Sequence, residues 1–304
     1  MEKQTFYSNG KLLLTGEYVV LDGAVSLAIP TKFGQSLIVE PLNEPKIKWK
    51  SLDEHGDIWY EDTFSIKDLK SERQNHPHEI SQRMIQILGA TQQLNPEFLE
   101  TGEGYRIITQ LNFPRNWGLG TSSTLINNIA SWAKIDAYQL LEKTFGGSGY
   151  DIACAQNNRP ISYQLLSNEP IVNQVEFHPN FKDHIFFVYL NKKQNSREGI
   201  AHYKSNNSRI TEEIDAINEI TKRMIHCENL FEFQILIDKH EEIISNILSQ
   251  KSIKEALFKD FIGSIKSLGA WGGDFVMVAS QKNPSDYFKS KGFETILSYE
   301  ELIK

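Results

Sequence analysis

The segment RNWGLGTSST, residues 115 to 124, limits the fold more than any other part of this 304-residue sequence. Two glycines, two threonines and two serines stand directly before the apolar run LINNIASWA. The first turn of a helix has unpaired backbone N–H groups and the positive end of the helix dipole, so a glycine turn there can hold a phosphate. The same turn is also compatible with an ordinary helix cap, and it matches neither GxxxxGK[ST] nor GxGxxG. The candidate phosphate loop comprises Gly118, Leu119, Gly120, Thr121, Ser122 and Ser123.

The composition is that of a globular protein, with 40% hydrophobic and 23% charged residues. A net charge of −7 argues against nucleic acid as the main partner but allows a small anionic ligand. Cys154 and Cys227 lack CxxC spacing, which indicates neither a disulfide framework nor a zinc site. The first residues lack the apolar core of a signal peptide, and no apolar run is long enough for a membrane span. We therefore expect a cytoplasmic protein without a membrane or nucleic-acid partner.

Apolar patterning predicts a sheet at the beginning of the chain and a mixture of helices and strands after it. Extended segments are expected at 11–21, 25–40, 46–51, 57–66, 104–113, 161–165, 184–190, 274–280 and 293–298. Helices are expected at 78–94, about 122–134, about 136–145, 210–248 with a break near 229, 252–268 and around 285–292.

Three further segments carry chemistry-bearing residues. In SNGKLLLTGEYVVLDG, Lys11 stands at the entry of an apolar strand, either as a surface charge or as a point charge directed at a phosphate. In GGSGYDIA, Asp151 begins a predicted helix, either as its cap or as a carboxylate acting on a substrate hydroxyl. In SLGAWGGDFVMVAS, three glycines form a loop before a buried strand, and this loop is either a simple turn or part of a ligand pocket.

These four segments together resemble the motifs of the GHMP kinase superfamily, the ATP-dependent small-molecule kinases. Their order matches PGKxxLxGEHxVxxG, GLGSSA, PSGxDxA and GAGGGGCxxAL, from residue 8 to residue 280. The resemblance implies an α+β, two-domain fold. A mixed α/β ATP-binding domain would span 1–170, and a ferredoxin-like α/β sandwich would span 171–304.

The resemblance also implies roles for individual residues. Asp151 and Lys11 would be catalytic, ATP would lie over the phosphate loop, and Mg²⁺ would be held by Ser122 and Glu142. The substrate-binding residues would be Glu17, Tyr18, Ser148, Gly149, Ser196, Arg197, Gly272 and Gly273. The basic loop NKKQNSREG, residues 191 to 199, has an alternative interpretation as a solvated surface loop.

Details within the motifs favour phosphomevalonate as the small-molecule acceptor: GEY in place of GEH, GSGYDIA in place of PSGVDNA, and Asp274 in GGD. Mevalonate, or a sugar or amino-acid alcohol, is the alternative acceptor. Trp271 stands where the closing motif usually has glycine, which favours a further alternative, a non-catalytic ligand sensor. An interaction scaffold built on the helices at 210–268 is a third class, and a homodimer is an additional expectation.

Overall fold

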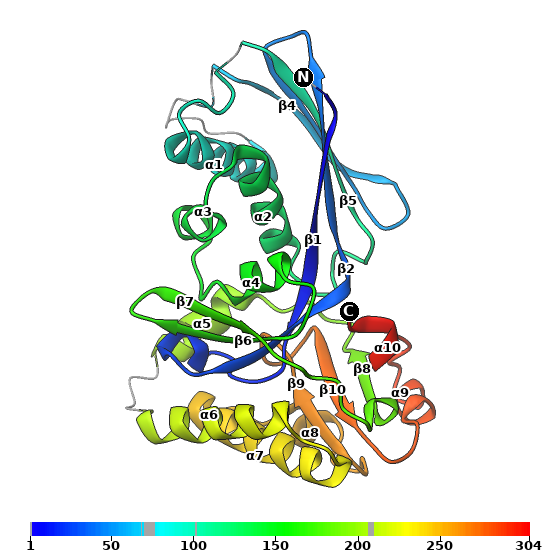
Figure 1. The fold of residues 1–304 in the computed structure, drawn as a ribbon. Coiled ribbons are helices and arrows are strands. Elements are labelled where there is room, and N and C mark those ends of the chain that lie inside the picture. Colours follow the sequence, from blue (N-terminus) through cyan, green and yellow to red (C-terminus); the bar gives the residue numbers. More distant parts are fainter. Residues whose placement is uncertain (1, 68, 70–76, 101, 206–209) are drawn as a thin grey trace. The chain divides into compact units, whose positions relative to one another are not determined.

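The computed structural model describes residues 2–67, 69, 77–100, 102–205 and 210–304. The chain forms two compact units (Figure 1). Unit 1 comprises the described residues of Met1–Gly10, Phe33–Arg115 and Gly120–Gln156, and unit 2 those of Lys11–Lys32, Asn116–Leu119 and Asn157–Lys304. The segments of the two units therefore alternate along the sequence. The predicted domain boundary at residue 170 stays a prediction.

Unit 1 is a sheet with helices on one face (Figure 1). Strand β3 (Lys46–Leu52) pairs antiparallel with β4 (Ile58–Ser65) and parallel with β5 (Gly104–Leu111), and β5 pairs antiparallel with β2 (Ser26–Leu42) from Gln35 onward. The helices are α1 (Glu79–Leu94), α2 (Thr121–Ala133), α3 (Ala137–Thr144) and α4 (Tyr150–Gln156). Buried apolar side chains such as Trp49, Leu88, Ile107 and Ile129 fill the layer between helices and strands. The first residues of β1 (Gln4–Leu13) also belong to this unit.

Unit 2 contains an antiparallel sheet of four strands within the described residues, in the order β11-β8-β10-β9. These strands are β8 (Ile185–Tyr189), β9 (Ser264–Ser267), β10 (Phe275–Ala279) and β11 (Ile296–Ser298). The beginning of β2 pairs with β6 (Ile161–Leu166), and β6 pairs with β7 (Glu169–Gln174). The helical segments are η1 (Val19–Asp22), η3 (Lys182–His184), α5 (Ser196–Ser205), α6 (Thr211–Ile225), α7 (Leu230–Leu248), α8 (Ile253–Leu257), α9 (Ser285–Ser290) and α10 (Tyr299–Leu302).

The predicted α+β fold class is confirmed. The expected break near residue 229 is also confirmed, because α7 begins at Leu230 and the Asn229 side chain caps it by accepting from the backbone N–H of Glu232 at 2.8 Å. In the part of the chain that the structure describes, no helix is long and apolar enough to cross a membrane.

Two sequence predictions are wrong. The helix expected at 252–268 ends as α8 at Leu257, and its last residues form strand β9. The reason is the position of β9 beside β10, which buries all four of its residues, so that tertiary pairing overrides the helical pattern. The strand expected at 11–21 begins at Gln4 and ends at Leu13, and Val19–Asp22 forms a 3₁₀ turn. Lys11 therefore lies near the end of its strand rather than at its entry.

Candidate active site

The candidate phosphate loop begins in unit 2, in contact with Lys11. Gly118 has a φ of +70°, a left-handed conformation that glycine adopts at little cost. The Lys11 ammonium Nζ donates to the Gly118 carbonyl oxygen at 3.2 Å, and the Lys11 backbone N–H donates to the Leu119 carbonyl at 3.0 Å. The first motif and the phosphate loop, separated by 107 positions in the sequence, are thus joined by both the side chain and the backbone of Lys11.

The loop continues in unit 1 as the beginning of α2. Gly120 is the N-cap with a φ of +94°, and no side chain caps the helix there. The Ser123 hydroxyl donates to the Gly120 carbonyl at 2.8 Å, whereas Ser122 is exposed and Thr121 is half-buried. The Gly120 cap therefore leaves the position in front of the helix without a side chain, and the Ser122 hydroxyl is accessible. This is the arrangement that suits an anion at a helix N-terminus.

Asp151 lies in the first turn of α4, as the sequence predicted. Gly149 precedes it with a φ of +85°, and the Gly149 carbonyl accepts from the backbone N–H of Ile152 at 3.0 Å. Helix α4 packs on α2, where the Gln156 side-chain amide donates to the Asn127 side-chain oxygen Oδ1 at 3.0 Å. The structure therefore holds the Asp151 segment, with Ser148 and Gly149, in the same unit as the beginning of α2. Because Lys11 belongs to unit 2, the joint action of Lys11 and Asp151 stays a prediction.

The predicted magnesium ligands are both exposed side chains of unit 1. Ser122 lies in the first turn of α2, and Glu142 lies in α3. Within the described ranges, no three His, Cys, Asp or Glu side chains are grouped so that they could hold a metal ion. A site with few protein ligands still fits Mg²⁺, which usually keeps several waters and binds substrate phosphates. The exposed Ser122 hydroxyl suits such an ion, and the role of Glu142 stays a prediction.

Glu17, predicted as substrate-binding, is 1% exposed and lies within a buried ionic cluster of unit 2. Its carboxylate accepts from the Lys266 ammonium at 2.7 Å, and the same ammonium is 3.5 Å from the Glu241 carboxylate. The Ser267 hydroxyl donates to Glu241 at 3.0 Å. We call Glu17, His240, Glu241 and Lys266 the sealed cluster, because each is less than 5% exposed.

The protonation states in the sealed cluster follow from its hydrogen bonds. The backbone N–H of Gly16 donates to His240 Nε2 at 2.9 Å, so this nitrogen is an acceptor and the imidazole is neutral. Burial and the Lys266 charge both hold the pKa of His240 well below its usual value. Burial raises the pKa of Glu241 to about 7, against the opposing effect of Lys266, and burial also raises the pKa of Glu17. Both buried carboxyls therefore take up a proton at a higher pH than exposed carboxyls do.

The closing glycine loop is held by the turn that follows Glu17. The Trp271 backbone N–H donates to the Tyr18 hydroxyl at 3.0 Å, and the Gln194 amide donates to the Trp271 carbonyl at 2.9 Å. A Cβ on Gly273 would lie 2.6 Å from the Lys192 carbonyl oxygen, so this position needs glycine, and Gly272 has a φ of +95°. Trp271 is 7% exposed, so the unexpected ring is buried.

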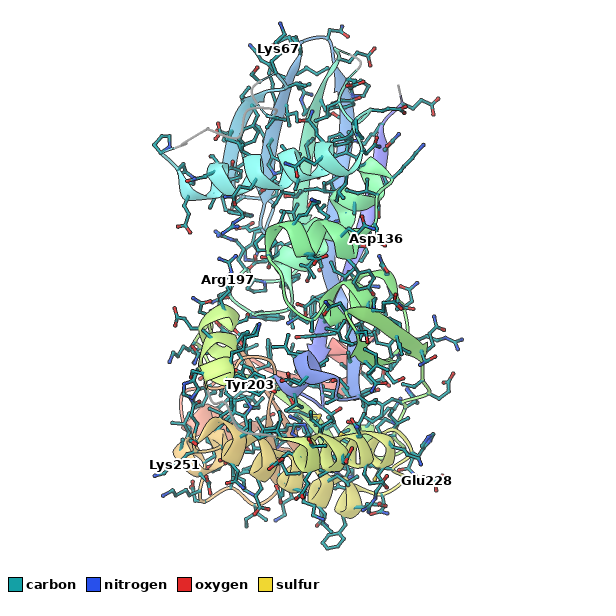
Figure 2. The ribbon with its side chains drawn as sticks, turned by 90° about the vertical axis from the view of Figure 1, so that its left-hand side faces the viewer. Lys67, Asp136, Arg197, Tyr203, Glu228 and Lys251 are labelled. Atoms are coloured by element: carbon teal, nitrogen blue, oxygen red, sulfur yellow. The ribbon has the colours of Figure 1, made fainter. Side chains whose placement is uncertain are left out.

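The basic loop at 191–199 is only partly a loop. It ends where α5 begins at Ser196, and the Asn195 side chain accepts from the backbone N–H of Arg197 at 3.1 Å, which explains this early helix start. Arg197 is exposed at the beginning of α5, and Tyr203 lies further along the same helix (Figure 2). The Tyr203 ring stacks on Tyr18 with 5.7 Å between centroids, and its hydroxyl donates to Asp22.

Sequence reasoning missed His240, Glu241 and Lys266. Glu241 and Lys266 stood in patterns that predict solvated helix faces, and a lysine inside a predicted helix gives no signal of burial. The contacts that identify them join residues up to 249 positions apart.

No protein-family model and no curated protein sequence matches the chain. Solved structures match it over nearly its whole length. The mevalonate kinase of Methanococcus jannaschii matches with a TM-score of 0.71 at 14% identity, covering 97% of each chain. The Streptococcus pneumoniae phosphomevalonate kinase, in complex with phosphomevalonate and AMPPNP, matches at 0.70 and 14% identity, covering 97% of this chain and 99% of that one. Lactococcus lactis galactokinase, complexed with galactose, matches at 0.67 and 14% identity, covering 95% and 88%.

The chain has the GHMP kinase fold. Identity of 14% supports likeness of fold alone, so the acceptor and the roles of individual residues depend on the site itself. In this GHMP fold, the segments that the sequence resemblance singled out lie at the beginning of α2, the beginning of α4, the end of β1 and the loop before β10.

Proposed function

We propose that this chain is an ATP-dependent kinase of small molecules, and that phosphomevalonate is its acceptor. The observation that carries the proposal is the contact between the Lys11 ammonium and the Gly118 carbonyl, which brings a cation to a glycine loop that leads into a helix. Both features attract a phosphate, and they come from distant parts of the sequence. Mg-ATP would bring the transferable phosphoryl group to this loop.

Phosphoryl transfer passes through a loose transition state, so positioning and charge neutralisation supply most of the acceleration. In this proposal Lys11 stabilises the charge that develops on the transferred group. Asp151, in the first turn of α4, orients the acceptor hydroxyl and takes its proton late in the reaction. The Ser122 hydroxyl would hold Mg²⁺, which supplies charge neutralisation on the phosphates when it is bound.

Phosphomevalonate as acceptor is supported by the motif details and by basic residues near the closing loop. Lys192 lies beside the closing loop, because its backbone carbonyl accepts from the backbone N–H of Asp274. Arg197 is exposed at the beginning of α5. Cations at these positions suit an acceptor that already carries a phosphate. Mevalonate is the alternative acceptor. The buried Trp271 favours a second candidate function, a ligand sensor that binds without turnover.

The test measures ADP release from Mg-ATP with mevalonate or 5-phosphomevalonate in separate reactions, against a blank with ATP alone. Turnover with 5-phosphomevalonate alone is the expected result, and turnover with mevalonate alone would replace the acceptor. The Asp151→Asn variant should lose about 10²- to 10⁴-fold in turnover while ATP affinity is retained. Asp57→Asn, an exposed carboxylate of unit 1 in the turn between β3 and β4, is the matched control. Nucleotide binding without turnover of any acceptor would favour the sensor.

A further inference from the structure

One cavity of unit 2 contains a single cation and a single anion among its lining side chains. The cation is Lys11 from β1, and the anion is Asp274, which stands between the closing loop and β10. The other lining residues are apolar or glycine, and Gly118 of the candidate phosphate loop is one of them. Lys11 and Asp274 are therefore the two charged side chains that determine the electrostatics of this cavity.

Asp274 is held in place by its backbone as well as by its side chain. Its φ of +52° is in the left-handed region, which Asp and Asn tolerate better than most residues. The Asp274 backbone N–H donates to the Lys192 carbonyl at 2.7 Å, and its carbonyl accepts from the Leu190 N–H at 2.8 Å. One carboxylate oxygen accepts from the backbone N–H of Gln194 at 3.2 Å. The backbone of Asp274 is therefore held by Lys192 and Leu190, and its carboxylate by Gln194.

The carboxylate of Asp274 lies against the first glycine of the phosphate loop. A Cβ atom on Gly118 would lie only 2.3 Å from the Asp274 Cγ and 2.5 Å from one of its oxygens. Gly118 therefore leaves the space that the Asp274 carboxylate fills, while the Gly118 carbonyl accepts from Lys11. Burial raises the pKa of Asp274, and the positive charges of Lys11 and Lys193 oppose that effect.

We propose that Asp274 is a resident anion of the phosphate site, held beside Gly118 and Lys11, with which an incoming nucleotide phosphate competes. This inference rests on the proposed function, because it requires a nucleotide at Gly118. Asp274 orders Lys11 when no nucleotide is bound, and its negative charge weakens the binding of a second anion at the same cation. Asp274 is accordingly a positioning residue that acts through Lys11.

The test compares the binding of ADP by calorimetry in wild type and in Asp274→Asn, with EDTA present to exclude metal ions. Asparagine keeps the shape, the left-handed conformation and the acceptor for Gln194, and removes only the charge. ADP affinity should rise on the order of tenfold, as expected for one like charge a few ångströms away in a partly solvated site. Adenosine, which lacks phosphates, should bind both proteins equally.

Two further variants make the result specific. Asp260→Asn removes the same charge from an exposed position of unit 2, paired with Lys291, and should leave ADP affinity unchanged. Asp274→Gly relieves the left-handed backbone and also removes the charge, so it should tighten ADP binding even if asparagine disturbs folding. Thermal melts of all variants establish that they are folded.

Each outcome decides the inference. Tighter ADP binding in Asp274→Asn and Asp274→Gly, with adenosine unchanged, supports it. Unchanged or weaker ADP binding in both variants overturns it and leaves the proposed function standing. Weaker Mg-ATP binding together with unchanged ADP binding would identify Asp274 as a metal ligand instead. Failure of every protein, wild type included, to bind ADP or ATP overturns both the inference and the proposed function.

Discussion

Two lysines of unit 2 stand beside carboxylates, Lys11 in the cavity at Gly118 and Lys266 in the sealed cluster, and they differ in what surrounds them. Lys266 is 0% exposed. Its ammonium donates to Glu17 and to the Ser267 carbonyl, and it lies 3.5 Å from the Glu241 carboxylate. Lys11 is half-buried and lines a cavity. A buried ammonium surrounded by acceptors maintains structure, whereas a half-buried one beside a glycine loop can meet a ligand. The same residue type thus serves folding in one place and, in the proposed function, phosphate chemistry in the other.

The largest effect that we expect is a loss of stability when the buried lysine is replaced. Lys266→Met would leave Glu17 and Glu241 buried without their cation, which should lower the free energy of unfolding by about 3–5 kcal/mol. Urea denaturation followed by circular dichroism measures the loss. Adding Glu17→Gln to Lys266→Met should recover part of it, because one uncompensated charge is then removed. A loss below about 1 kcal/mol in the single variant would contradict the structural role of Lys266.

The same substitution at Lys11 should act on turnover rather than on folding. Lys11→Met should lower kcat by about 10²- to 10³-fold, because a charge that stabilises the transition state is removed. The midpoint of urea denaturation should remain close to that of wild type. Steady-state kinetics with the acceptor that gives turnover in the ADP-release assay measures the effect. If Lys11→Met unfolds the protein while turnover per folded molecule is unchanged, the contrast between the two lysines is wrong.

Within the sealed cluster, Glu241 and His240 should make the stability depend on pH in opposite directions. The pKa of Glu241 is raised to about 7, so its contribution to stability is fully present below its unfolded value of 4.5 and is lost as the pH rises toward 7. His240 has the opposite sign, because its lowered pKa makes stability fall as the pH drops below 6.5. The two contributions oppose each other between these values.

Removal of one of these groups should therefore reveal the other. Glu241→Gln should make stability fall more steeply on acidification from pH 6.5 to 5, by at most about 1.4 kcal/mol per pH unit for one proton. Urea denaturation at several pH values measures the slope, with Glu242→Gln, the adjacent exposed residue, as the control. An unchanged slope would show that Glu241 is already ionised in the folded protein.

The smallest effect is expected at a surface pair of the same unit. Arg223 donates to Glu232 at 2.7 Å, yet the two side chains are 49% and 36% exposed. Arg223→Gln should cost no more than about 1 kcal/mol, because water screens exposed ion pairs. Urea denaturation measures this change beside Lys266→Met. A cost equal to that of Lys266→Met would mean that burial does not explain the strength of the sealed cluster.

The sequence predicted the local parts of the site and missed the parts that depend on distant contacts. Gly118 and Gly120 have positive φ values, and α2 and α4 begin where the patterns indicated, because caps and turns are determined by nearby residues. Strand β9 was predicted as helix, and the burial of Lys266 could not be predicted, because both depend on pairing with β10 and on Glu17. The roles of Ser122, Glu142 and Asp151 stay predictions, because a role depends on a bound ligand as well as on the fold.

The division of unit 2 into separate stretches of chain also affects how the protein is made. The Gly16 N–H reaches its acceptor His240 across 224 positions, and Thr31 forms a bridge with Ile303 near the end of the chain. A ribosome adds about 5–20 residues per second, so Gly16 waits roughly 10–45 s for its partner to be synthesised. During that time the segment that carries Lys11 and Glu17 lacks its final neighbours. Such long-range contacts slow folding, and the nascent chain would depend on protection of these apolar strands until the last residues emerge.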